Sequence, residues 1–79
     1  MNYIVYGKKI GDHRYGAMNL HEGKVGVGLL YATLIPDYDR AKMYADKLAE
    51  MAPGFIFQVR GAGTHKVYYE KAGKPEESV

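Results

Sequence analysis

Short apolar runs separated by glycine-containing turns predict strands in the first half of the chain. Residues 3–6 (YIVY) are β-branched and aromatic, so they predict a strand that can continue to Ile10. Gly11 and Asp12 supply turn chemistry, and residues 14–20 are therefore expected to return as a second strand and close a hairpin. Residues 28–35 are apolar at almost every position, which predicts a third strand in the centre of the sheet.

The pattern changes to a helical period after Pro36, which ends the third predicted strand. Apolar side chains recur at gaps of three and four between residues 41 and 52, so they form one stripe along a helix. Asp37 is suited to cap this helix, because its carboxylate can accept hydrogen bonds from the free amides of the first turn. Pro53 and Gly54 end it, since glycine can adopt the left-handed conformation found after helices.

The C-terminal third of the chain predicts two further strands. Residues 55–60 form the fourth strand, residues 61–64 a turn, and residues 66–70 a fifth strand whose alternating polarity is typical of a sheet edge. The predicted order β-β-β-α-β-β is an α+β fold, an antiparallel sheet of about five strands with one amphipathic helix on one face. Residues 1–71 are expected to form a single domain, followed by a polar, disordered tail at 72–79.

A single helix is too narrow to cover such a sheet. Five strands span about 20 Å because neighbours lie about 4.8 Å apart, whereas a helix is about 10 Å across. The first and third predicted strands are apolar on both faces, although a half-solvated antiparallel sheet should alternate between apolar and polar residues. The second face is therefore expected to be covered by a second copy of the chain, a macromolecular partner, a flat ligand or curling of the sheet. A homodimer and a curled sheet are the simplest of these.

Composition narrows the class of protein. The 79 residues are 47% hydrophobic and 25% charged, which is typical of one small globular domain. The absence of cysteine excludes disulfides and thiolate metal sites. No apolar run approaches the roughly 18 residues of a membrane span, and the N-terminus lacks the pattern of a secretory signal. We expect a cytoplasmic protein without a membrane partner or a cofactor.

Basic and aromatic residues gather around the first predicted hairpin in a chain of net charge +2 with eight tyrosines. Lysine and arginine contact phosphates, and tyrosine rings stack on bases. The predicted ligand-binding residues are Tyr6, Lys8, Lys9, His13, Arg14, Tyr15 and Arg60. The alternative interpretation is a solvated hairpin whose lysines protect an edge strand from pairing.

The sequence offers little for catalysis or for metal binding. His13, His21 and His65 are the only imidazoles, and no two of them have the spacing of a helical zinc motif. His21 and Glu22 with His13 could support acid–base chemistry in a hydrolase, but histidines in surface turns explain the pattern more simply. Gly26-Val27-Gly28 leads into a strand rather than a helix, so it indicates a bulge or close backbone packing rather than a phosphate loop. We therefore predict a non-enzymatic protein without catalytic or metal-binding residues.

Residues 3–9 and 11–15, with 30–33 before the helix and 57–60 after it, resemble a group of uncharacterised short proteins of bacteriophages and bacterial mobile elements. The resemblance covers most of residues 3–60 and transfers neither an activity nor a functional residue. It implies a phage-like accessory or anti-defence protein in a bacterial host cell. Such a protein would bind a host protein or sequester a phosphate-bearing ligand such as a nucleotide messenger.

The alternative function is a small DNA- or RNA-binding domain that uses the basic and aromatic first hairpin. Three strands followed by a helix are similar in architecture to the arm-type DNA-binding domain of phage integrases. Two features depart from that pattern, because two more strands follow the helix and the sheet is apolar rather than rich in arginine and lysine. A likeness of architecture alone is a weak basis for a function.

Overall fold

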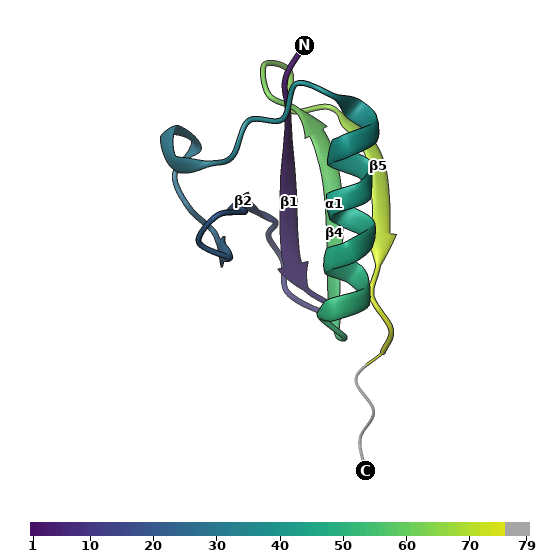
Figure 1. The fold of residues 1–79 in the computed structure, drawn as a ribbon. Coiled ribbons are helices and arrows are strands. Elements are labelled where there is room, and N and C mark those ends of the chain that lie inside the picture. Colours follow the sequence, from purple (N-terminus) through teal and green to yellow (C-terminus); the bar gives the residue numbers. More distant parts are fainter. Residues whose placement is uncertain (76–79) are drawn as a thin grey trace.

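The computed structural model describes residues 1–75 as one antiparallel sheet with a single α-helix packed on one face (Figure 1). This is the α+β fold that the sequence predicts. The elements in chain order are β1 (Tyr3–Lys9), β2 (Gly16–Asn19), β3 (Lys24–Val25), the 3-10 turn η1 (Leu29–Tyr31), α1 (Tyr38–Met51), β4 (Phe55–Gly61) and β5 (Val67–Ala72).

The strand order in the sheet is β3-β2-β1-β4-β5, which places β1 in the centre. β1 pairs with β4 along its whole length, from Tyr3 opposite Gly61 to Lys9 opposite Phe55. On its other edge β1 forms the predicted hairpin with β2, where Gly7 faces Gly16. β5 pairs only with β4 and lies at the sheet edge, as its alternating polarity predicts.

The prediction of a central strand over residues 28–35 is wrong. The third strand is instead the two-residue β3 at the opposite edge from β5. Gly26 then takes a φ of 81°, which turns the chain out of the extended direction. Residues 29–31 form the 3-10 turn, and only Ile35 returns to the sheet, in an isolated bridge with Tyr3. A continuous apolar run carries no period, so it does not distinguish a buried strand from another apolar segment.

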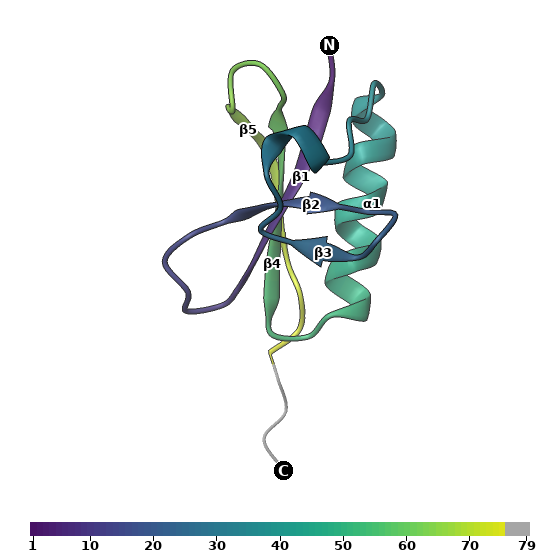
Figure 2. The ribbon, with the colours of Figure 1, turned by 90° about the vertical axis from the view of Figure 1, so that its left-hand side faces the viewer.

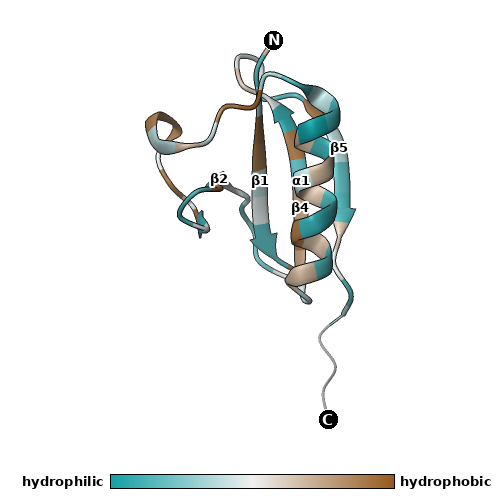
Figure 3. Cartoon of the chain, viewed as in Figure 1, coloured by the Kyte–Doolittle hydropathy of each residue, from teal (hydrophilic) through white to brown (hydrophobic). Residues whose placement is uncertain are grey.

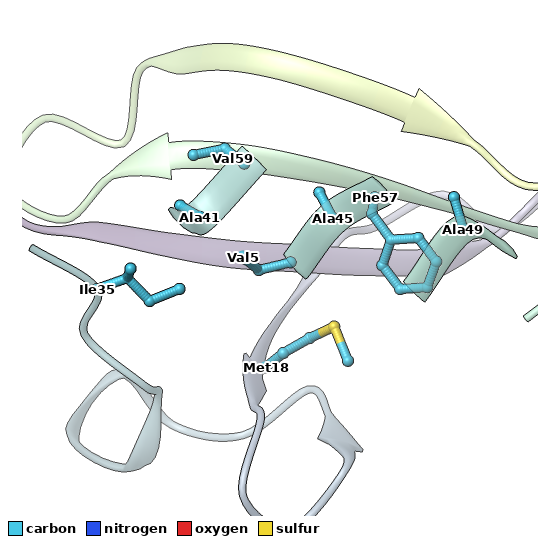
Figure 4. Packing of buried hydrophobic residues seen from close by; sticks show 8 residues of the cluster. All are labelled: Val5, Met18, Ile35, Ala41, Ala45, Ala49, Phe57 and Val59. Carbon is cyan, nitrogen blue, oxygen red and sulfur yellow. The ribbon is translucent and has the colours of Figure 1, made fainter. Parts of the chain in front are cut away.

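The helix begins and ends where the sequence predicts. The Asp37 carboxylate caps the first turn by accepting a hydrogen bond from the Asp39 amide at 3.2 Å. Gly54 follows the last turn with a φ of 83°. Figure 4 shows the alanines of the apolar stripe of α1 facing the sheet above Val5, Phe57, Val59, Met18 and Ile35. Three of these alanines, Ala41, Ala45 and Ala49, are fully buried.

Residues of the chain itself cover the second face of the sheet around β1. Ile4 and Tyr6 of β1 are buried there with Ala17, although the helix packs on the opposite side. Tyr15, Ala32 and Ala62 pack against them. Figure 2 shows the loop between β1 and β2 projecting on the side of the sheet away from α1. The apolar second face predicted for the first strand is confirmed, and residues of three loops supply cover for it.

β5 begins one residue later than the predicted fifth strand and extends two residues further, through Lys71 and Ala72. Gly73 and Lys74 continue to hydrogen bond with residues 54 and 55 at the end of α1 and the start of β4. The chain therefore stays paired three residues beyond the predicted end of the domain at residue 71. The rest of the predicted disordered tail, residues 76–79, lies outside the described residues. Within residues 1–75, no helix has the length and apolarity needed to cross a membrane.

Candidate functional site

The sheet face away from α1 carries a stack of cationic and aromatic side chains, which we call the open-face stack: Lys8, Tyr15, Arg60 and Tyr6. The Tyr15 ring contacts both cations, with the Lys8 Nζ atom 5.0 Å and the Arg60 Cζ atom 5.1 Å from its centroid. Arg60 also lies over the Tyr6 ring, at 4.3 Å from the centroid. These distances are within the range of cation–π contacts, so the four side chains hold one another in place.

Hydrogen bonds fix the guanidinium of this stack. The Nε and Nη2 atoms of Arg60 donate to the Gln58 side-chain oxygen at 2.9 Å and 2.8 Å. The Gln58 amide in turn donates to Glu70 at 2.7 Å. The register of β4 and β5 accounts for the bond between Gln58 and Glu70, because these two residues lie directly opposite each other. Arg60 is thus oriented by a neutral amide and by two tyrosine rings, and it forms no ion pair within residues 1–75.

Tyr15 crosses the sheet face to reach the same carboxylate. Its hydroxyl donates to Glu70 at 3.2 Å, although the residue precedes β2 on the other side of β1. Burial raises the pKa of the Tyr15 hydroxyl, and the negative charge and hydrogen bond of Glu70 raise it further. The hydroxyl therefore keeps its proton at physiological pH. The ring is held by the hydrogen bond to Glu70 and by the contacts with Lys8 and Arg60.

A hollow of about 430 Å³, which we call the basic hollow, lies between the β1–β2 loop and β3. Such a volume suits a small ligand. Three cations from β1 and the loop border it, and Asp12 is the one acid among the described residues that line it. The lining consists of Gly7, Lys8, Lys9, Asp12, Arg14, Tyr15, Gly16, Val25, Gly26 and Phe55.

None of the three cations of the basic hollow has a carboxylate partner within residues 1–75. The only ion pair in that part of the chain joins Lys24 and Glu22, at 3.8 Å on the surface. Lys9 and Arg14 are both exposed. Lys8 donates to the Asp12 backbone carbonyl at 2.8 Å, which ties the loop back onto β1. The hollow therefore presents three cations against the single carboxylate of Asp12, and none of the three forms an ion pair within residues 1–75.

Close backbone packing forms one wall of the hollow. A Cβ atom on Gly16 would lie 2.6 Å from the Gly26 backbone, so only glycine fits at this crossing of β2 and the end of β3. The amides of Gly26 and Val27 both donate to the Ala17 carbonyl. The close backbone packing expected at Gly26-Val27-Gly28 is found at Gly26, but these residues lead into the 3-10 turn η1 and not into the expected strand.

The structure brings six of the seven predicted ligand-binding residues into two adjoining sites. Tyr6, Lys8, Tyr15 and Arg60 form the open-face stack, and Lys9 and Arg14 join Lys8 and Tyr15 around the basic hollow. His13 is exposed on the same loop but is not among the residues that line the hollow.

Sequence reasoning missed the polar residues that organise the stack. Gln58 is 8% exposed in an otherwise apolar part of β4, and a single buried amide of this kind is a signal of a hydrogen-bond network. Glu70 becomes recognisable only once the register of β4 and β5 is known. His65, whose Nδ1 atom lies 3.3 Å from the Tyr6 hydroxyl, is placed by the β4–β5 turn, where it has a φ of 58°.

The structure does not bring together His13, His21 and Glu22, the residues that could support acid–base chemistry in a hydrolase. His13 precedes β2 and His21 follows it with Glu22, so the two histidines lie beyond opposite ends of that strand. The described chain, residues 1–75, contains no group of three or more histidine, aspartate and glutamate side chains that could hold a metal ion.

Comparisons with protein families, with curated proteins and with solved structures found no match for this chain. No activity is therefore carried over from a relative, and the function has to be argued from the basic hollow and the open-face stack.

Proposed function

We propose that the domain is a non-enzymatic binding module that holds a phosphate-bearing ligand in the basic hollow. The observation that supports this is the convergence of Lys8, Lys9 and Arg14 on one cavity in which Asp12 is the only lining acid. Phosphate oxygens accept charge-assisted hydrogen bonds from such groups, and arginine can provide two parallel bonds. A cavity of about 430 Å³ has room for a nucleotide rather than for an isolated ion alone.

The three cations would have different roles. Arg14 lies on the loop and can provide a planar fork to two phosphate oxygens, whereas Lys9 acts as a point charge at the end of β1. Lys8 already binds the Asp12 carbonyl and the Tyr15 ring, so it orders the wall of the hollow as well as adding charge. Binding would require no bond to be made or broken, and the protein would act by sequestering its ligand.

Tyr15 supports a nucleotide as the kind of ligand. Its hydroxyl is held by Glu70, so its ring keeps one orientation at the edge of the hollow. A fixed aromatic ring beside bound phosphates provides an apolar wall for a base or a ribose. In the bacterial cytoplasm, a phage-like protein with this site would withdraw a nucleotide messenger from the host.

A short single-stranded nucleic acid is the second candidate, because the open-face stack adjoins the basic hollow through Lys8 and Tyr15. The two sites together form a path of cations and rings along which a strand could lie. Tyr6 is only 6% exposed, so it cannot offer its face to a base. For this reason we place the mononucleotide or cyclic dinucleotide first.

Isothermal titration calorimetry with AMP, a cyclic dinucleotide, inorganic phosphate and a short oligothymidylate tests both candidates. We expect Lys9→Ala and Arg14→Ala each to weaken nucleotide binding about tenfold or more, the value of one charge-assisted hydrogen bond. Lys47→Ala, which removes an equal charge from the exposed side of α1, is the matched control and should bind as the wild type does.

The results separate the two candidates. Tighter binding of the oligonucleotide than of AMP, with a log–log salt slope of about −0.7 per phosphate contact, would favour the nucleic acid. The absence of heat with every ligand at millimolar concentration would reject the proposal, as would an equal loss of affinity in the Lys47→Ala control.

A further inference from the structure

The segment between β3 and α1 exposes apolar side chains that would ordinarily be buried. Leu30 is 95% exposed, with Leu29 at 54% and Tyr31 at 70%. Figure 1 shows this segment projecting from the side of the sheet, and Figure 3 shows hydrophobic residues along it. Single exposed apolar residues are ordinary, but a contiguous group of this kind marks an interaction surface. We call residues 29–31 the apolar knob.

Hydrogen bonds hold the apolar knob in one position. The Asn19 side chain donates to the Tyr31 carbonyl at 2.9 Å, and the Tyr31 amide donates to Gly28 at 2.8 Å. Next to the knob, the Thr33 amide donates to the Met18 carbonyl at 3.1 Å, and the Thr33 hydroxyl accepts from the Leu20 amide at 2.9 Å. The leucines are thus presented by an ordered turn, which lowers the entropy cost of docking them.

A second hollow lies beside the apolar knob. It has a volume of about 260 Å³, and most of its lining is apolar. The segment that carries the knob also supplies four of its wall residues, from Thr33 to Pro36, so protrusion and hollow belong to one continuous surface. The complete lining is Leu20, His21, Thr33, Leu34, Ile35, Pro36, Arg40 and Tyr44. We call it the apolar hollow.

We infer that the apolar knob docks into the apolar hollow of a second copy of this chain, in a two-fold symmetric dimer. A surface that carries both a protrusion and a recess meets the requirement of a two-fold symmetric contact, because each copy then supplies both parts. The inference does not depend on the proposed ligand site, since neither the knob nor the apolar hollow shares a residue with the basic hollow.

Charge favours a second copy as the occupant. Near a two-fold axis a residue lies close to the same residue of the other copy, so a charged side chain there meets a like charge. Residues 26–36 contain no charged side chain, and Arg40 is the only lysine, arginine, aspartate or glutamate that lines the apolar hollow. This uncharged stretch is therefore suited to self-association, whereas the basic β1–β2 loop would repel its own copy.

Light scattering coupled to size-exclusion chromatography tests the inference on the full chain, from about 1 μM to about 1 mM. We expect a mass approaching twice 8.8 kDa for the wild type at the upper concentrations. Leu30→Ser should weaken the dimer tenfold or more, as the truncation of a central apolar anchor does. Because Leu30 is almost fully exposed in the single chain, this variant should melt as the wild type does at low concentration.

Two further variants make the result specific. Met51→Ser removes an apolar side chain that is 78% exposed at the end of α1 and should leave the dimer intact. Leu34→Arg places a charge in the wall of the apolar hollow and should produce a monomer. A wild-type mass of 8.8 kDa at every concentration would overturn the inference, and a different protein or a lipid would then have to cover the knob. A Leu34→Arg variant that stays dimeric would equally overturn it, because the knob would then not occupy the hollow.

Discussion

Gly7 shows how single residues determine the core on the helix side of the sheet. A Cβ atom at this position would lie 2.9 Å from two carbon atoms of the Phe57 ring and 3.3 Å from the Met18 sulfur. The ring of the facing β4 residue therefore occupies the space that a side chain on β1 would need. The sequence shows a glycine inside an apolar strand. Only the register between β1 and β4 shows that the Phe57 ring fills the space beside it.

Gly7→Ala should lower the free energy of unfolding by about 1–3 kcal/mol, because the added methyl group forces Phe57 out of its position. Urea denaturation followed by circular dichroism measures the change. Gly63→Ala is the control, since a Cβ atom there meets nothing within 4 Å. Equal stability of the Gly7→Ala variant and this control would show that the core accommodates the extra atom.

Tyr69 carries a titratable group whose environment depends on the fold. Its hydroxyl donates a hydrogen bond to the Asp46 carboxylate of α1, and this bond, together with burial and the charge of Asp46, raises the Tyr69 pKa above its usual value of about 10. At pH values between the unfolded-state and folded-state pKa, the folded chain keeps the proton that the unfolded chain has lost. The free energy of unfolding therefore falls as pH rises through this interval.

Tyr69→Phe should make the loss of stability above about pH 10 less steep, because the variant has no proton to retain at this position. The measurement is the urea midpoint at about pH 8 and about pH 11. Tyr68→Phe, which alters the neighbouring ring on the same strand, should keep the wild-type slope. An unchanged slope in Tyr69→Phe would mean that the bond to Asp46 does not form in solution.

At the scale of elements, the sequence predicts those whose side chains follow a period. The stripe of α1 and the cap at Asp37 predict the helix, and alternation predicts the edge position of β5. Residues 28–35 have no period, and their apolar character suggests burial although four of their side chains are more than half exposed. The hydrophobic pattern of a sequence cannot distinguish an apolar surface segment from a core strand, because both consist of the same types of residue.

Asp37→Ala should destabilise the domain by about 1 kcal/mol, since the Asp39 amide loses its acceptor at the helix N-terminus. Asp37→Asn is the matched control, because asparagine caps helices about as well as aspartate. Urea midpoints of the two variants provide the comparison. A loss of stability as large in Asp37→Asn as in Asp37→Ala would point to the charge rather than the capping bond.

At the scale of the whole molecule, the functional surfaces depend on contacts between distant parts of the chain. The clustering of Lys8, Lys9, Arg14 and Tyr15 is predictable, because a hairpin brings together residues that are close in sequence. The open-face stack is not, since Arg60 reaches Tyr15 only after β4 has paired with β1. Loop residues cover the second sheet face around Ile4 and Tyr6, and the most exposed large apolar side chain within residues 1–75 is Leu30 in the knob.

The two surfaces suggest a division of tasks within one small domain. The basic hollow lies between the β1–β2 loop and β3, and the apolar knob follows β3 on the way to α1. We propose that the first binds a phosphate-bearing ligand and that the second joins two copies. A dimer would then present two basic hollows, so two ligand groups on one molecule could be bound together with a higher apparent affinity.

The basic hollow as a ligand site is the central claim, and nuclear magnetic resonance of the ¹⁵N-labelled chain tests it most directly. Titration with AMP and with a cyclic dinucleotide should shift the amide resonances of residues 7–16 and 25–26, and Arg14→Ala should need about ten times more nucleotide to reach the same shifts. Unchanged spectra at millimolar nucleotide, or shifts confined to residues outside the lining of the hollow, would contradict it.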